Sequence, residues 1–341
     1  MRFMGFLVLT LLVIGCSDVP KKNSRTEVER FFKGADVSWL PQMEQSGFVF
    51  YDFDGREKDL LDILRENGMN IIRLRTWVNP SDDPINGHCS ADETVDMAVR
   101  VKQKGFSLII NFHYSDSWAD PSKQYKPKRW EGLTFEELKN AVYDYTKEVM
   151  TKLASRGVYP EFVQIGNEIN SGILWPDGSY TNFSKLAELL ASGARAVRDV
   201  NSNTLIVMHL ANGHDAGLFR WFFSNLNRYF TNYDVIGMSY YPYWAGNWRY
   251  SLPMLVSNME EMVRSYGKYV MVVETGHFYY EEEESYDMLV SLIEGVRNIS
   301  GGKGLGVLYW EPQGAEIWSR YSMSCWRNDG RPTKALKAFR R

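Results

Sequence analysis

Cysteine is scarce in this chain, and the spacings that bind metal ions are missing. The 341 residues include 3 Cys, with no CxxC pair and no Cys/His spacing of the kind that holds structural zinc. No HExxH or comparable metal-ligand pattern occurs either. The sequence therefore gives no support for a zinc site or a metalloenzyme, and we expect no metal ion and no cofactor.

The chain also has little net charge. The chain has 39 Lys and Arg against 42 Asp and Glu, a formal net charge of −3, which gives no electrostatic support for a nucleic-acid partner. Aromatic residues are abundant instead, at 14% of the chain with 11 Trp. This composition is globular, and the aromatic excess indicates surfaces that stack on rings or sugars.

The only long apolar run lies at the N-terminus. Residues 1–15 place one Arg before an apolar segment, which is typical of a signal peptide and too short to span a membrane. Val13-Ile14-Gly15-Cys16 resembles a bacterial lipobox, which implies cleavage before Cys16 and lipidation of its thiol. The alternative is an ordinary secretory signal. Residues 16–30 are polar and are predicted to form a flexible tether. We expect an exported protein that is lipid-anchored in a bacterial outer membrane, on a face that the sequence does not decide.

Two cysteines remain after Cys16. In an oxidising compartment Cys89 and Cys325 could form a disulfide, or they could be two separate buried thiols. The sequence leaves both alternatives open.

Residues 31–341 show no linker and no close repeat, so they are predicted to form one domain. Helical patterns occur over 92–105, from Thr134 to about Ser155, over 182–200 and over 286–298. They alternate with eight strand-like runs, at 34–38, 70–76, 106–112, 162–166, 204–209, 234–239, 269–273 and 304–309. This α/β alternation predicts a (β/α)8 TIM barrel. An open doubly wound sheet is the alternative, but no GxGxxG follows the first strand.

Polar and aromatic residues gather where the predicted strands end. In a barrel those ends share one rim, the place where active sites form. The rim residues are Trp39, Arg75, Trp77, His113, Trp118, Trp130, Asn167, Glu168, Trp175, His209, Tyr240, Tyr241, Trp244, Trp248, Glu274, His277, Trp310 and Glu311.

Two glutamates at this rim suit the cleavage of a glycosidic bond. Glu168 follows the fourth predicted strand and Glu274 the seventh, on opposite sides of a barrel mouth. The reaction needs a carboxylic acid that protonates the leaving oxygen and a carboxylate on the other side of the anomeric carbon. The pair resembles clan A of the glycoside hydrolases, which implies Glu168 as acid/base and Glu274 as nucleophile. The alternative is that each glutamate is buried in an ion pair with Arg73 or Arg75.

Longer motifs resemble glycoside hydrolase family 53, the endo-β-1,4-galactanases, over roughly residues 34–341. The most specific is Asn111-Phe-His-Tyr-Ser-Asp-Ser-Trp-Ala-Asp-Pro121, which continues to Gln124, Pro127 and Trp130. Others are Gly34-Ala-Asp-Val-Ser38, Arg73-Leu-Arg-Thr-Trp77, Ile173-Leu-Trp-Pro176, His209-Leu-Ala-Asn212, Ile236-Gly-Met-Ser-Tyr-Tyr-Pro-Tyr-Trp244 and Val273-Glu-Thr-Gly276. The resemblance implies retaining, endo-acting hydrolysis of β-1,4-galactan, the pectic side chain of type I arabinogalactan.

The chain departs from that family pattern at two places. Asn111 stands where the family is expected to have Asp, which would alter a hydrogen bond beneath the sugar at the cleavage point. The segment after Glu274 lacks the Asp/Asn-rich loop with which some relatives hold calcium, so a calcium site is not carried over. Its run Glu281–Glu284 is expected to begin a helix.

The remaining roles follow from the chemistry. We expect Asn167 to bond the sugar 2-hydroxyl, and Arg75 to keep Glu274 ionised. Other rim residues are expected to orient the nucleophile and the sugar or to stack on galactose rings: His113, His209, Tyr240, Trp118, Trp175 and Trp310. The expected partner is galactan or a galacto-oligosaccharide, bound by a monomer. The competing interpretations are another clan A enzyme acting on mannan, xylan or cellulose, and a non-catalytic glycan-binding lipoprotein.

Overall fold

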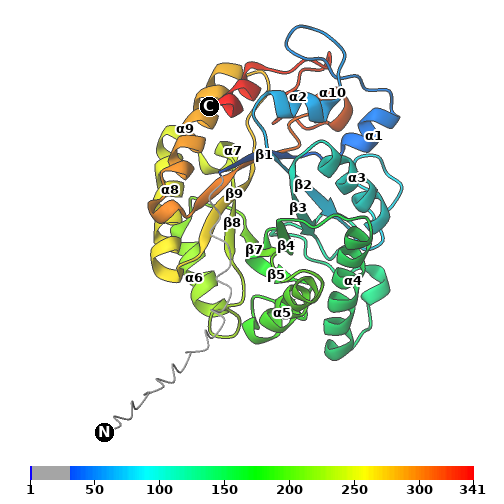
Figure 1. Ribbon diagram of the computed structural model, residues 1–341, viewed down its shortest axis with the longest axis vertical. Coiled ribbons are helices and arrows are strands. Elements are labelled where there is room, and N and C mark those ends of the chain that lie inside the picture. The colour runs from blue at the N-terminus through cyan, green and yellow to red at the C-terminus, as the bar shows by residue number, and fades with distance from the viewer. Residues whose placement is uncertain (2–30) are drawn as a thin grey trace.

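The computed structural model describes Met1 and residues 31–341, and it shows a closed barrel of eight parallel strands (Figure 1). Around the barrel the strands follow the order β1-β10-β9-β8-β7-β4-β3-β2. The predicted (β/α)8 barrel is therefore confirmed, and the open sheet is wrong. Its strands are β1 Phe32–Asp36, β2 Ile71–Thr76, β3 Ser107–Phe112, β4 Phe162–Ile165, β7 Leu205–Leu210, β8 Val235–Tyr240, β9 Tyr269–Thr275 and β10 Gly304–Trp310.

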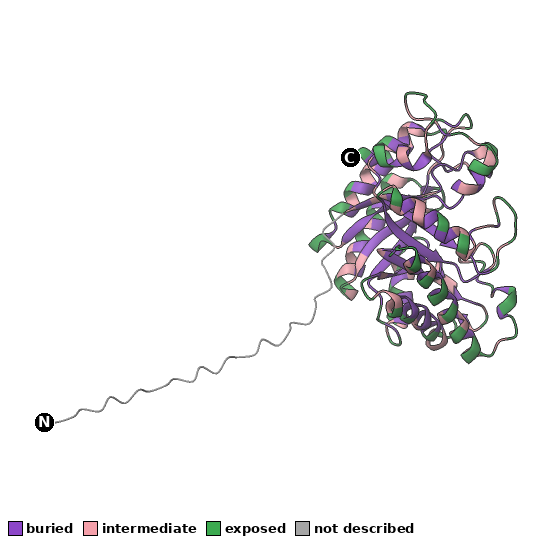
Figure 2. Ribbon diagram, turned by 45° about the vertical axis from the view of Figure 1, so that its right-hand side comes forward, coloured by how far each residue is buried: buried purple, intermediate pink, exposed green. Residues whose placement is uncertain are grey.

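A ring of helices covers the outside of the barrel, with buried faces on the strands and exposed faces outward (Figure 2). The main helices are α1 Leu40–Gln45, α2 Leu60–Glu66, α3 Ala91–Gln103, α4 Phe135–Ser155, α5 Phe183–Val200, α6 Ala216–Leu226, α8 Trp248–Tyr266 and α9 Glu282–Arg297. Short elements complete the rim and the C-terminus: β5 Gly172–Ile173, β6 Gly178–Ser179, α7 Pro242–Ala245, α10 Glu316–Ser319, and the 3-10 helices η1 Lys128–Trp130, η2 Ile169–Ser171, η3 Ser300–Gly302 and η4 Lys334–Arg340.

The helix signals in the sequence mark real helix starts. Thr134 caps α4, and Glu137 bonds back to it in the predicted capping box. The predicted helix over 286–298 begins earlier, at Glu282. Glu282, Glu283 and Glu284 occupy its first turn, where negative side chains interact favourably with the positive end of the helix dipole.

The barrel interior has an apolar floor and a polar upper layer. One buried cluster draws residues from all eight barrel strands and from no helix, among them Ile71, Phe162 and Val207. Because side chains alternate along a strand, the residues two positions further on face the same way. On β2 and β7 these are Arg73 and His209, which bury polar groups directly above the apolar floor.

The two remaining cysteines are separate buried thiols, not a disulfide. Burial raises the pKa of Cys89 to about 12 and raises that of Cys325 as well, so both thiols stay protonated and unreactive. The predicted signal peptide, tether and lipidated Cys16 lie outside the described residues. Within the described part of the chain, no helix has the length and apolar character needed to cross a bilayer.

Candidate active site

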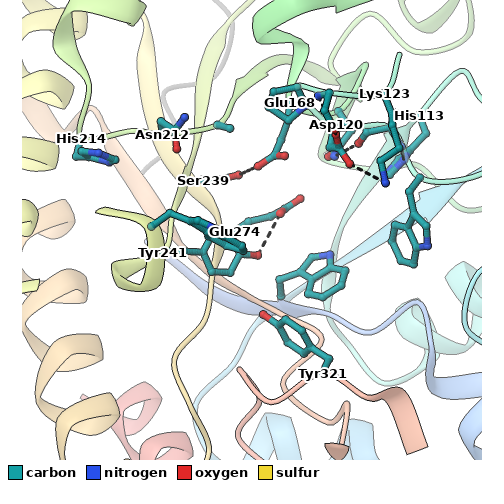
Figure 3. A pocket seen from close by; sticks show the side chains of 18 residues that line it. His113, Asp120, Lys123, Glu168, Asn212, His214, Ser239, Tyr241, Glu274 and Tyr321 are labelled. Carbon is teal, nitrogen blue, oxygen red and sulfur yellow. Dashed lines mark hydrogen bonds and ion pairs between the residues drawn. The ribbon is translucent and has the colours of Figure 1, made fainter. Parts of the chain in front are cut away.

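A cavity of about 540 Å³ opens at the carboxyl ends of the barrel strands. In Figure 3, Glu168 and Glu274 reach into it from opposite sides and their carboxyl groups face each other. Of the residues predicted for the site, it is lined by Glu168, Glu274, Asn167, His113, Trp118 and Trp310. Arg75, Trp175, His209 and Tyr240 are not part of the lining.

Glu168 is placed by an unusual backbone turn after β4. Gly166 and Glu168 both have positive φ, of 82° and 44°, and the chain then enters η2. A Cβ on Gly166 would lie 2.5 Å from Cγ2 of Ile169, so only glycine fits there. A non-glycine residue in the left-handed region costs about 1–3 kcal/mol, and such strain concentrates at functional sites.

The environment of Glu168 favours its protonated form. Burial raises its pKa to about 8, and the nearby negative charge of Glu274 adds to the increase. Ser239 opposes this shift, because its hydroxyl donates a 2.6 Å hydrogen bond to Oε1 of Glu168. A carboxylic acid that keeps its proton near neutral pH has the property needed to protonate a leaving oxygen.

Glu274 lies beside a cation. Burial raises its pKa, but Arg73 opposes the shift with Nη2 at 2.8 Å from Oε1. The hydroxyl of Tyr241 donates a 3.2 Å hydrogen bond to the other carboxylate oxygen. Since Arg73 contacts Glu274 and not Glu168, the pair shares its charge unequally: Glu168 holds the proton and Glu274 the negative charge.

Arg73, not Arg75, is the cation at Glu274, so the predicted role of Arg75 is wrong. Both arginines lie on the inward face of β2, but Arg75 ion-pairs with Glu311 and lies 3.7 Å from Asp36. Glu311 follows directly after β10, has a φ of 46° and is fully buried, and the backbone N–H of Trp39 also donates to its carboxylate. Glu311 is thus the strand-end carboxylate that is buried in a structural ion pair.

Asn167 connects Arg73 on β2 with the segment after β3. Its Oδ1 accepts hydrogen bonds from Nη2 of Arg73 at 2.8 Å and from Nδ2 of Asn111 at 3.1 Å. Its Nδ2 donates one proton to the carbonyl oxygen of Ala119 at 2.8 Å, which leaves the second proton for a ligand in the cavity. Asn111 thus donates to Asn167, and its own Oδ1 is buried without a hydrogen-bond partner.

His209 reaches the carboxyl group of Glu168 through Ser239, and its Nδ1 also accepts a 3.4 Å hydrogen bond from the backbone N–H of Glu168. Gln164 donates to its Nδ1 at 2.8 Å, so Nε2 carries the proton and donates to the Ser239 hydroxyl at 2.8 Å. Burial and the charge of Arg73 hold the pKa of His209 well below its usual range, so the ring is neutral. His209 is therefore a positioning residue rather than one that contacts the sugar.

Tyr240 is wrongly predicted because it points out of the barrel. Ser239 and Tyr241 face inward along β8, so the residue between them faces α8, where its hydroxyl bonds to Ser251 at 2.9 Å. Tyr241 takes the place expected for Tyr240. Alternation along β8 puts Val235, Gly237 and Ser239 on one face, and this pattern would have predicted that Tyr241, not Tyr240, faces the cavity.

Trp175 lies in the turn of the β5–β6 hairpin rather than in the cavity wall. Its indole N–H donates to the carbonyl oxygen of Ser171 at 2.8 Å, and its ring meets the edge of Tyr125. Trp118 and Trp310 line the cavity as predicted, joined by Tyr321, which sequence reasoning missed because it comes from the long segment after β10.

Comparison with known proteins agrees with this geometry. The family model of glycosyl hydrolase family 53 matches residues 32–339. The chain is 36% identical over 308 residues to an endo-β-1,4-galactanase of Bacillus subtilis (strain 168), covering 83% of this chain and 70% of that protein. It is 36% identical over 307 residues to arabinogalactan endo-β-1,4-galactanase A of Aspergillus niger, covering 82% and 85%. The solved catalytic domain of an Ignisphaera aggregans family 53 protein superposes with a TM-score of 0.83 at 35% identity, covering 91% of this chain and 95% of that one. The chain belongs to glycosyl hydrolase family 53.

Proposed function

We propose that this protein hydrolyses internal β-1,4-galactosidic bonds of galactan and type I arabinogalactan, with retention of configuration. Its support is the unequal protonation of Glu168 and Glu274 within one cavity, together with relatives that carry the name endo-β-1,4-galactanase. The unequal pair is the observation that carries the proposal, because a pure binding surface needs neither an acid nor a nucleophile.

The reaction proceeds in two displacements. Glu274 attacks the anomeric carbon as the glycosidic bond breaks, and Glu168 gives its proton to the departing oxygen, which leaves a glycosyl-enzyme ester and an ionised Glu168. Water then attacks the same carbon, Glu168 accepts its proton, and Glu274 leaves as a carboxylate. The free N–H of Asn167 bonds the 2-hydroxyl, an interaction that strengthens as oxocarbenium character develops.

A panel of polysaccharides tests this proposal. The purified protein should depolymerise β-1,4-galactan and act weakly on mannan, xylan and cellulose. Endo action lowers the viscosity of the polymer well before much reducing sugar appears. Equal or better turnover of mannan or xylan would assign the activity to another clan A class, and binding of galactan without cleavage would leave a glycan-binding protein.

We further propose that the protein is exported and held at the outer membrane by a lipid on Cys16, and that it acts as a monomer. The lipobox-like residues 13–16 support the anchor, and a cavity completed by side chains of one chain supports the monomer. Cys16→Ala should release the protein from the membrane fraction with unchanged specific activity. A variant that still pellets with membranes would contradict the anchor.

A further inference from the structure

A second cavity of about 450 Å³ lies on the same rim as the catalytic cavity. It is formed by the segment after β8, which contributes Tyr243 and Trp248, and by the segment after β9, which contributes His277 and Phe278. The two cavities have no lining residue in common. Nothing in the reaction at Glu168 and Glu274 requires this second cavity.

A ridge of aromatic rings connects the two cavities. Trp244 lines the catalytic cavity, where its ring centroid lies 5.2 Å from that of Tyr241. The ring centroid of Trp244 also lies 5.1 Å from that of Tyr243, and the Tyr243 centroid lies 5.6 Å from that of Phe278. Phe278 in turn stacks on Tyr280 at 5.1 Å with nearly parallel planes. A bound chain could therefore pass from one cavity to the other over a continuous aromatic surface.

The ridge is exposed to an extent that folding does not explain. Tyr243, Trp244 and Tyr280 are 61%, 62% and 60% exposed. Contiguous exposed apolar surface of this kind marks binding sites in soluble proteins. Aromatic faces are also the surfaces on which the apolar C–H faces of pyranose rings stack.

The walls of the second cavity are fixed before any ligand arrives. Glu284 accepts two hydrogen bonds from Arg249, at 2.8 and 3.1 Å, and a third from the indole N–H of Trp248 at 2.8 Å. The guanidinium of Arg249 also lies over the Trp248 ring at 4.4 Å. These contacts join the start of α8 to the first turn of α9, so the cavity does not need to be formed by its ligand.

The polar groups of the cavity suit a neutral, hydroxyl-bearing ligand. Glu281 and Glu284 both line it, while its one Arg is engaged by Glu284, so an anion finds no free positive charge among the lining residues. The His277 side chain is only 10% exposed, and its Nδ1 has no hydrogen-bond partner, lying 3.7 Å from the nearest Glu281 oxygen. The Nδ1 atom itself is buried, so His277 is part of the wall of the cavity rather than a free contact for the ligand.

We propose that the second cavity, with Tyr243 and Phe278 as its aromatic wall, is a distal subsite that binds a galactose unit of the same chain that is being cleaved. This inference rests on the proposed galactanase function. It predicts that the enzyme gains efficiency with chain length beyond what the catalytic cavity alone can hold.

The test compares a short substrate with a long one in the full-length protein. Tyr243→Ala and Phe278→Ala should each lower kcat/KM on polymeric galactan by about tenfold, which corresponds to roughly 1.4 kcal/mol of lost transition-state binding. Both should leave kcat/KM on an aryl galactobioside unchanged, because that substrate fills only the catalytic cavity. The matched control is Tyr229→Ala, which removes a ring of similar exposure, 54%, from the segment after α6.

Three results would contradict the subsite. One is retention of polymer kcat/KM by both variants, and another is an equal loss on polymer and on aryl galactobioside, which would place the rings in the catalytic cavity. The third is an equal loss in the Tyr229→Ala control. Failure of the unmodified protein to cleave galactan is a separate outcome, which refutes the proposed function and the subsite with it. The melting temperature of each variant, compared with that of the unmodified protein, reports its folding.

Discussion

Removal of the Ser239 hydroxyl directly tests which contacts set the pKa of Glu168. That hydroxyl donates a 2.6 Å hydrogen bond to Glu168, and the bond lowers a pKa that burial and Glu274 raise to about 8. A hydrogen bond to a charged group contributes about 1.5 kcal/mol at the lower end of its range, and 1.36 kcal/mol corresponds to one pKa unit. Ser239→Ala should therefore raise the pKa of Glu168 by about one unit.

The sign of the effect follows from the role of Glu168. The acid must be protonated when the leaving oxygen departs, so activity falls as the pH rises through its pKa. Since Ser239→Ala raises that pKa, the alkaline limb of kcat/KM should move to higher pH by about one unit. The plateau below the limb should fall, because the carboxyl group loses the contact that orients it.

The assay is the pH dependence of kcat/KM on an unactivated galacto-oligosaccharide, whose leaving group needs protonation. Ser251→Ala is the matched control, since it also removes a buried serine hydroxyl with a hydroxyl partner, Tyr240, but on the outer side of β8. It should leave the limb in place. An alkaline limb of Ser239→Ala that stays at the original pH, or moves to lower pH, would refute the tuning by Ser239.

Further predictions concern the glutamates, the arginines and metal ions. With an aryl galactobioside and azide, Glu168→Ala should give the β-glycosyl azide and Glu274→Ala only the α-anomer; the opposite pattern would reverse their roles. Arg73→Lys should lower kcat by about 10²-fold, because an ammonium cannot replace the guanidinium fork that holds both Asn167 and the carboxylate of Glu274; an unchanged kcat would contradict this. Arg75→Met should lower the free energy of unfolding in urea by about 3–5 kcal/mol, since it leaves a buried carboxylate unpaired. Dialysis against EDTA should change neither activity nor melting temperature, and a fall in either would reveal a metal site.

The sequence predicts the barrel well because each strand of a parallel sheet can be recognised from its own residues. A strand buried on both faces reads as a continuous apolar run, and each predicted run overlaps an observed strand. The location of the site follows from the same pattern, because parallel strands bring their carboxyl ends to one rim. The errors arise one step later, in deciding which side chain of a strand end faces inward. At Tyr240 the alternation along β8 held the answer.

Other features depend on contacts between distant segments and leave no local signal. Arg73 and Arg75 lie on the same face of β2, and the ion pair that distinguishes them is made by Glu311, which follows β10 and is distant in the sequence. Trp175 follows the fourth predicted strand in the sequence, but it lies in the hairpin after β4 and is not part of the cavity lining. Neither the partner of Arg75 nor the position of Trp175 can be predicted from residue spacing within one helix or strand.

A register shift between β8 and β9 explains how Glu274 reaches the cavity. Met238 pairs with Val272, but the next residue, Ser239, pairs with Glu274, so β9 carries one extra residue at this point. Val273 faces the barrel floor, and strict alternation would turn the following residue outward. The bulge lets Glu274 point inward as well, toward Arg73 and across from Glu168. Two glutamates at similar strand ends thus become different acids, because the bulge brings Glu274 into contact with Arg73, whereas the carboxyl group of Glu168 accepts a hydrogen bond from the neutral Ser239 hydroxyl.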